Sequence, residues 1–216
     1  MTSYLLTVLG NGRPAYLART LAAIDQHLTP APGELVLFDD STERLGQCGA
    51  QARVWAHTAA SGFEYVLHFE EDYVLLRPVD VRDMIALMEA QPHLLALTLM
   101  RTPWGAELEF GGFVPQSPGH YERKTAQLPT GVHPLDGPEW REVEWIETTR
   151  NWSNAPTLFR TELAREFEWP AVPGCETMIG PQMLERYPEG KFALWGSGSC
   201  DVAHIGVVRG EGYHGY

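Results

Sequence analysis

Three consecutive acidic residues interrupt a stretch of chain that otherwise reads as buried. Glu70, Glu71 and Asp72 follow the largely apolar run 65–69, and a second apolar run, 73–76, follows them at once. Carboxylates held beside a core repel one another and lose hydration, so they usually require a cation. A divalent metal ion is the natural one. A strand end with a solvated acidic turn is the alternative that this stretch alone leaves open.

Two other apolar runs also end in polar residues. Residues 3–9 stop at the turn 10–14, and residues 34–38 stop at the acidic pair 39–40. Between these runs, residues 14–28 carry apolar side chains at the spacing of one helix face, and the run opens with a proline, which suits the first helical position. The pattern predicts a strand, a helix and a second strand.

A second helical stretch, 45–60, connects the acidic pair to the strand that begins at Tyr65. Continuous apolar strands separated by helices indicate an α/β fold, Rossmann-like, with a mostly parallel central sheet and helices on both faces. The ligand crevice of such a sheet lies at the carboxyl ends of its strands. All three polar clusters fall at those ends, so we expect them to form one site.

The second half of the chain has a less regular pattern. It predicts a helix from Asp80, strands at 94–100, 143–149, 191–195 and 202–208, helices at 160–167 and 176–187, and a glycine-rich tail. The intervening segment 101–141 is rich in Pro, Gly and aromatic residues and lacks clean periodicity. Irregular segments of this length inside a compact domain are usually functional, and the aromatic residues favour an ordered one.

Composition and charge limit the partners. The 216 residues are 44% hydrophobic, and no linker or charge block divides them, so we predict a single domain over 1–216. The net charge of −12 disfavours polymeric nucleic acid and anionic lipid. We find no membrane span and no signal peptide pattern, which predicts a soluble cytoplasmic protein.

The cysteines support the same compartment. Cys48, Cys175 and Cys200 are odd in number and widely spaced, without a Cys-x-x-Cys pair. This argues against a disulfide framework and against a structural zinc site, and it fits a reducing environment.

Four segments together resemble the GT-A glycosyltransferases of the large inverting family two. They are the stretches 5–24, 35–41, 68–75 and His204-Ile205-Gly206, and the resemblance covers the first hundred residues well and the remainder at isolated points. In that family the sheet binds a nucleotide diphosphate sugar, and an Asp-x-Asp-type motif holds Mg²⁺ or Mn²⁺ on the diphosphate. The resemblance implies a metal-dependent inverting transferase that uses a donor, expected to be UDP-linked, and an acceptor hydroxyl. Residues 1–100 would bind the donor and residues 101–216 the acceptor.

The resemblance also assigns residues on the donor side. It places Asp72 on the last acid of the metal motif and His204 on the late metal-binding histidine. Glu70 departs from the family pattern, in which Asp is usual, and would reach the metal through water or bind the ribose. The other residues that it implies for the nucleotide sugar are Gly10, Arg13, Asp39, Asp40 and Glu71.

The catalytic base of that family is a carboxylate at the start of a helix in the second half. Glu176 is the best match, although Thr177 follows it where an acid is common. The alternative is a helix N-terminal glutamate that interacts only with the helix dipole. The other acids that remain open as the base are Glu107, Glu109, Asp136 and Glu144.

Further residues carry weaker expectations. Asn151 and Trp152 lie in a segment with several donors and acceptors, and we expect them to recognise sugar hydroxyls, whereas His68 is expected to be a buried, hydrogen-bonded histidine. Two other functions stay open. A sugar nucleotidyltransferase would need a longer Gly-rich phosphate loop after the first strand, and a non-catalytic carbohydrate-binding domain on a degenerate transferase fold would not need its acidic residues.

Overall fold

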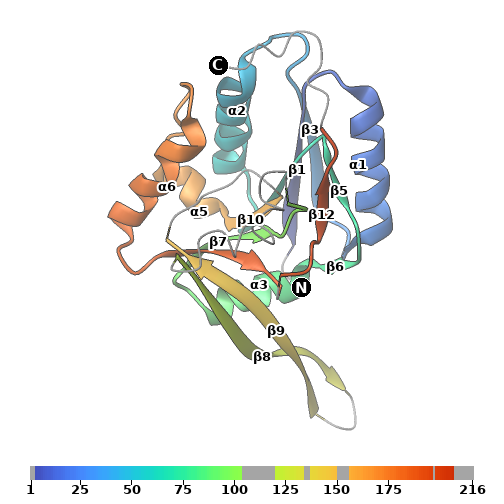
Figure 1. Ribbon diagram of the computed structural model, residues 1–216, viewed down its shortest axis with the longest axis vertical. Coiled ribbons are helices and arrows are strands. Elements are labelled where there is room, and N and C mark those ends of the chain that lie inside the picture. Colours follow the sequence, from blue (N-terminus) through green and yellow to red (C-terminus); the bar gives the residue numbers. More distant parts are fainter. Residues whose placement is uncertain (1–2, 104–119, 134–136, 150–155, 197, 207–216) are drawn as a thin grey trace.

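The computed structural model describes residues 3–103, 120–133, 137–149, 156–196 and 198–206, and its centre is an eight-stranded sheet (Figure 1). The strand order is β3-β1-β4-β10-β7-β11-β9-β8. Six of these strands point the same way, and β10 and β9 run opposite to them. The strands are β1 Tyr4–Gly10, β3 Glu34–Asp39, β4 Tyr65–Glu70, β7 Leu94–Leu99, β8 Tyr121–His133, β9 Gly137–Thr148, β10 Thr157–Arg160 and β11 Lys191–Trp195.

Helices cover both faces of the sheet, and Figure 1 shows α1 and α2 on opposite sides of β1. Side chains alternate between the two faces: Leu6 and Val8 of β1 join the core under α1 and α3, whereas Leu5 joins the core under α2, α5 and α6. This alternation is the period of a strand that is buried on both sides. The helices are α1 Pro14–His27, α2 Gly46–Ala60, α3 Val81–Ala90, α5 Thr161–Glu166 and α6 Cys175–Arg186.

Two short ribbons complete the described structure. One pairs β5 (Tyr73–Leu75) with β12 (Val202–His204), and the other pairs β2 (Leu28–Thr29) with β6 (Val79–Asp80). The first brings residues 202–204 beside the acidic stretch. The predicted strand 202–208 therefore ends at His204, and the tail 207–216 lies outside the described residues.

The irregular segment expected over 101–141 is a wrong prediction for its second part. Residues 121–133 and 137–148 pair as two long antiparallel strands, β8 and β9, which extend away from the rest of the sheet (Figure 1). The alternation of exposed Glu142 and Glu144 with buried Val143 and Trp145 overlaps the strand predicted at 143–149. The prediction missed β8 and the part of β9 before residue 143. Residues 104–119 lie outside the described structure.

The expectation against disulfides is also wrong. Cys48 on α2 and Cys175 at the start of α6 form a disulfide, with their Cα atoms 5.8 Å apart and 127 positions between them in sequence. A spacing argument cannot detect a bond between two helices that only the sheet brings together. The cysteine pattern therefore no longer supports a reducing compartment. None of the described helices is long and apolar enough to cross a membrane.

Candidate active site

The three polar clusters meet at one edge of the sheet. In the parallel register Gly10 at the end of β1 lies beside Asp39 at the end of β3, and Leu9 lies beside Glu70 at the end of β4. The backbone continues this alignment past the strands, since the amide of Glu71 donates to the carbonyl of Leu9 at 2.8 Å. The acidic stretch therefore lies at the carboxyl ends of the parallel strands, where the sequence predicted the site.

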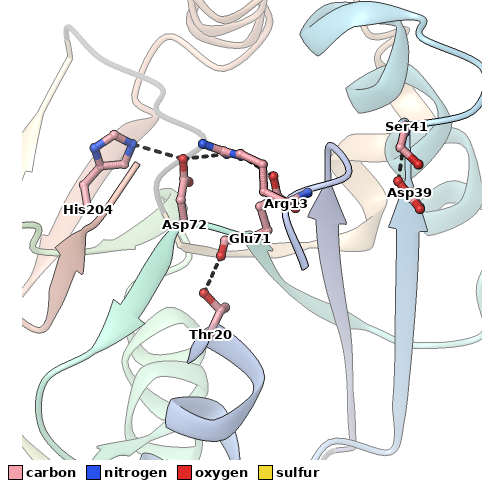
Figure 2. A network of polar contacts seen from close by, with 7 residues as sticks. All are labelled: Arg13, Thr20, Asp39, Ser41, Glu71, Asp72 and His204. Carbon is pink, nitrogen blue, oxygen red and sulfur yellow. Dashed lines mark hydrogen bonds and ion pairs between the residues drawn. The ribbon is translucent and has the colours of Figure 1, made fainter. Parts of the chain in front are cut away.

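Arg13 supplies a cation to this stretch (Figure 2). Its Nε lies 2.5 Å from Glu71 Oε1, and its Nη2 lies 2.8 Å from Asp72 Oδ2. Burial opposes the charge on the guanidinium, but the two carboxylates outweigh it and raise the pKa of Arg13. Arg13, in the first strand-to-helix turn, therefore supplies part of the positive charge that offsets the clustered carboxylates.

Glu71 is directed into the protein. It is 2% exposed, and besides the Arg13 side chain its carboxylate contacts the Arg13 backbone amide at 3.4 Å. Thr20 of α1 donates to the Glu71 carbonyl at 2.6 Å. A side chain at Gly10 would place its Cβ only 3.0 Å from Glu71 Oε2, so it would push against this carboxylate. Gly10 and Glu71, both predicted to bind the nucleotide, fix the turn that presents Arg13.

Asp72 lies between Arg13 and His204, which approach it from opposite sides in Figure 2. His204 Nε2 is 3.5 Å from Asp72 Oδ2, and the β5–β12 ribbon sets this distance by pairing His204 with Tyr73. Burial opposes ionisation of Asp72, but hydrogen bonds from His204 and Arg13 and their charges lower its pKa on balance. Asp72 is therefore held as a carboxylate.

The donor set of Asp72 and His204 fits a hard divalent cation. The second oxygen of Asp72, Oδ1, is buried and has no hydrogen-bond partner among the described residues. A Cβ at Gly206 would overlap Asp72 Oδ2, so the chain passes close to this carboxylate and position 206 has no room for a side chain. Within the described ranges no group of three or more His, Cys, Asp or Glu residues is placed to hold a metal. Mg²⁺ or Mn²⁺ would accordingly take its remaining ligands from phosphate oxygens and water.

The acidic pair after β3 divides into two roles. Asp39 is exposed, and hydrogen bonds from the backbone and side chain of Ser41 lower its pKa. Asp40 is 4% exposed, and its two carboxylate oxygens accept from the amides of Leu45, at 2.9 Å, and Gly46, at 3.0 Å. Asp40 therefore anchors the start of α2, and Asp39 is the member of the pair that faces solvent.

Glu70 and Glu176 lie within each other's electrostatic field. Burial raises the pKa of Glu70 to about 8, with smaller contributions from the charges of Glu176 and Asp72. Gln51 Nε2 donates to Glu70 Oε1 at 3.1 Å, and Gln47 Nε2, one turn earlier on α2, donates to Glu176 Oε1 at 3.0 Å. The structure thus brings Glu176, more than a hundred positions away in sequence, to the edge that carries Glu70.

His68 is confirmed as a buried, hydrogen-bonded histidine. Its Nδ1 lies 2.9 Å from Thr7 Oγ1 and its Nε2 lies 3.0 Å from Gln51 Nε2, and burial lowers its pKa to about 3. The two glutamines were missed by the sequence reasoning. Their spacing of four positions on a predicted helix was the available signal, but two glutamines at that spacing are common on any helix.

Several candidates do not join the described site. Glu144 is exposed on β9 and lines a different cleft, with Arg77 and Trp195 among its walls. The remaining ones lie outside the described residues, namely Asn151, Trp152, Glu107, Glu109 and Asp136.

Comparisons with known proteins identify the architecture. No family model matches the sequence, and no curated protein matches it. Among solved structures, the chain is similar to residues 1–349 of S. aureus TarS, a GT-A-type family 2 glycosyltransferase. The fold is that of a GT-A glycosyltransferase. This confirms the predicted α/β fold with its mostly parallel sheet.

The similarity to TarS is low in sequence identity and covers part of TarS 1–349. The complex of TarS with UDP-GlcNAc aligns with a TM-score of 0.59 at 13% identity, over 97% of this chain and 62% of TarS 1–349. The complex with UDP gives 0.56 at 14% identity, over 94% and 60%. The chain therefore spans about three-fifths of the TarS segment. At this identity the similarity establishes the fold, and the activity has to be argued from the site.

Proposed function

We propose that the protein is a metal-dependent inverting glycosyltransferase that moves a sugar from a nucleotide diphosphate sugar, UDP-linked, to an acceptor hydroxyl. The observation that carries the proposal is the buried carboxylate of Asp72 at the carboxyl edge of the sheet. One of its oxygens has no partner among the described residues, and His204 lies 3.5 Å from the other. Support comes from the shared fold, since TarS has been seen with UDP and with UDP-GlcNAc.

On the donor side Asp72 and His204 would hold Mg²⁺ or Mn²⁺. When bound, the ion neutralises charge on the leaving diphosphate. Arg13 adds a fixed positive charge at the same edge, because Glu71 holds its guanidinium in place. Asp39, exposed at the end of β3, would accept hydrogen bonds from the nucleoside.

On the acceptor side Glu176 acts as the general base. The acceptor oxygen bonds to the anomeric carbon, the bond from that carbon to the diphosphate oxygen breaks, and Glu176 takes the hydroxyl proton. Glu70, with its pKa raised to about 8, is largely protonated at neutral pH. It can therefore donate a hydrogen bond to the substrate without placing another negative charge beside Glu176.

Calorimetric titration of the wild-type protein with UDP, with and without Mn²⁺, tests the donor side. We expect Mn²⁺-dependent binding, and we expect Asp72→Ala to weaken it by about a hundredfold or more, because this variant loses the only carboxylate in the proposed metal site. Asp25→Ala, an exposed acid on α1, is the matched control and should bind as the wild type does. Unchanged affinity in Asp72→Ala would refute the metal assignment, and absence of UDP binding to the wild type would refute the function.

A further inference from the structure

Two neighbouring residues near the start of α2 hold two neighbouring residues at the start of α6. Cys48 is bonded to Cys175, and Gln47 Nε2 donates to Glu176 Oε1 at 3.0 Å. We propose that these four residues, the α2–α6 clamp, position Glu176 for proton transfer and make sugar transfer depend on the disulfide. The proposal rests on the proposed function, in which Glu176 is the base, and it adds Gln47 as a positioning residue and the disulfide as a redox-sensitive support.

The first turn of α6 has no side-chain cap among the described residues, and of its first four residues Cys175 alone is buried. Its N-cap is Gly174, with φ +82° and no side-chain cap, and the only acid in its first turn is Glu176. The body of the helix is held by the buried Ile179 and Met183. Thr177 bonds within its own turn, to the carbonyl of Gly174. Contacts from outside the helix are therefore expected to decide where the first turn, and the Glu176 carboxylate with it, is placed.

The start of α2, by contrast, is firmly anchored. Asp40 accepts from the amides of Leu45 and Gly46, immediately before Gln47, and ties the helix to the end of β3. One turn further, Gln51 donates to Glu70 at 3.1 Å. A single face of α2 therefore sets the positions of both carboxylates. A positioned base requires its carboxylate within hydrogen-bond reach of the acceptor, so a small shift of the α6 first turn lowers turnover.

Reduction removes the covalent half of the clamp. A dithiol such as dithiothreitol gives two electrons and two protons to the Cys48–Cys175 bond, yields two thiols and closes to its own cyclic disulfide. The hydrogen bond from Gln47 then acts without covalent support. The donor-side residues Arg13, Asp72 and His204 lie on other elements and are outside the clamp, so UDP affinity should survive reduction.

The test compares the oxidised full-length protein, the same protein reduced with dithiothreitol, Cys48→Ser/Cys175→Ser, Gln47→Ala, and Cys200→Ser as the control for the remaining cysteine. Non-reducing peptide mass spectrometry verifies the linkage in each sample. We expect reduction and the double serine variant to lower the rate at which UDP is released from the donor by about tenfold. The Kd for UDP in Mn²⁺ should stay within about twofold of the oxidised wild type. Reoxidation should restore the rate. Gln47→Ala should lower the rate about fivefold with the disulfide intact. Cys200→Ser should match the wild type.

Several results would overturn the proposal that the α2–α6 clamp positions Glu176. These are a full rate after complete reduction, free thiols at Cys48 and Cys175 in the active protein, or rate losses that only follow parallel losses in Tm and UDP affinity. Hydrogen exchange of residues 175–180 tests positioning without any turnover: faster exchange after reduction supports the clamp, and unchanged exchange refutes it. Failure of the proposed function is recognised separately, by absent UDP binding or by full activity of Glu176→Gln.

Discussion

The two carboxylates that the proposed reaction needs most, Asp72 and Glu176, are held in contrasting ways. Asp72 is fixed by polar neighbours near strand ends: Arg13, which follows β1, and His204, the last residue of β12. Glu176 begins a helix and is held by a glutamine and a disulfide on another helix. The donor side is therefore organised by electrostatics at the sheet edge, and the base side by contacts between helices. Variants on the two sides should fail in different ways.

The largest effect that separates the two sides is expected from Glu176→Gln. Glutamine keeps the size of the side chain and can still accept from Gln47, but it cannot take a proton. Turnover should fall about a hundredfold or more, with donor affinity and Tm little changed. Steady-state transfer, UDP titration and thermal melting on this one variant provide the measurement.

Preserved turnover in Glu176→Gln would contradict the role of Glu176 as the base. If Glu176 only interacts with the helix dipole, the variant loses a little stability and keeps its turnover. A rate within about threefold of the wild type would move the role of base to another acid, such as Asp136.

A smaller effect is expected on the donor side from His204→Ala. Imidazole is a good ligand for Mn²⁺ but brings no negative charge, so metal affinity should weaken about tenfold, less than in Asp72→Ala, and turnover should fall with it. A titration of the rate against Mn²⁺ measures both quantities. A wild-type rate across the whole titration would show that His204 only packs against Tyr73.

This contrast also explains what could be predicted from sequence. The strand-end residues were identifiable because parallel strands bring their carboxyl ends to one edge, so Gly10, Asp39 and Glu70 had to be neighbours once the strands were found. The contacts of Glu176 cross 129 positions between two helices, and no periodicity encodes them. The disulfide was missed for the same reason.

Local pattern also failed to separate binding from support within the site. Asp39 and Asp40 are adjacent and chemically identical, but one faces solvent and the other accepts two amides at the start of α2. Glu71, a third carboxylate of the site, is buried against Arg13. Only the direction of each side chain distinguishes these roles, and direction depends on the turn that follows each strand.

A pH-dependent effect should mark where the two sides meet, at Glu70. Its pKa rises from 4.5 to about 8 in the folded protein, so between these values the folded state binds more protons than the unfolded chain. The free energy of unfolding therefore loses this contribution as the pH rises through that range. Relative to Glu70→Gln, the wild-type protein should lose roughly 2–3 kcal/mol of its free energy of unfolding as the pH rises through that range. This figure is discounted because the Glu70 side chain is partly exposed.

Chemical denaturation of the wild type and Glu70→Gln from pH 4 to 9, with chelator present to exclude metal ions, measures this difference. Glu168→Gln, an exposed glutamate, is the control and should run parallel to the wild type. If the curve of Glu70→Gln also runs parallel to that of the wild type, then Glu70 is ionised at neutral pH, and it would repel Glu176 instead of donating a hydrogen bond to substrate.

The smallest effect, and the one that separates support from binding, is expected from Asp40→Ala. Loss of the acceptor for the amides of Leu45 and Gly46 should lower the free energy of unfolding by about 1–2 kcal/mol, as for loss of a helix cap. UDP affinity measured well below the melting transition should stay within about threefold, whereas Asp39→Ala should weaken it without loss of stability. Asp40→Asn, which keeps one oxygen acceptor, should recover part of the stability. If Asp40→Ala instead abolishes UDP binding and melts at the wild-type temperature, Asp40 belongs to the nucleotide site, and the anchoring of α2 contributes little to the position of Glu176.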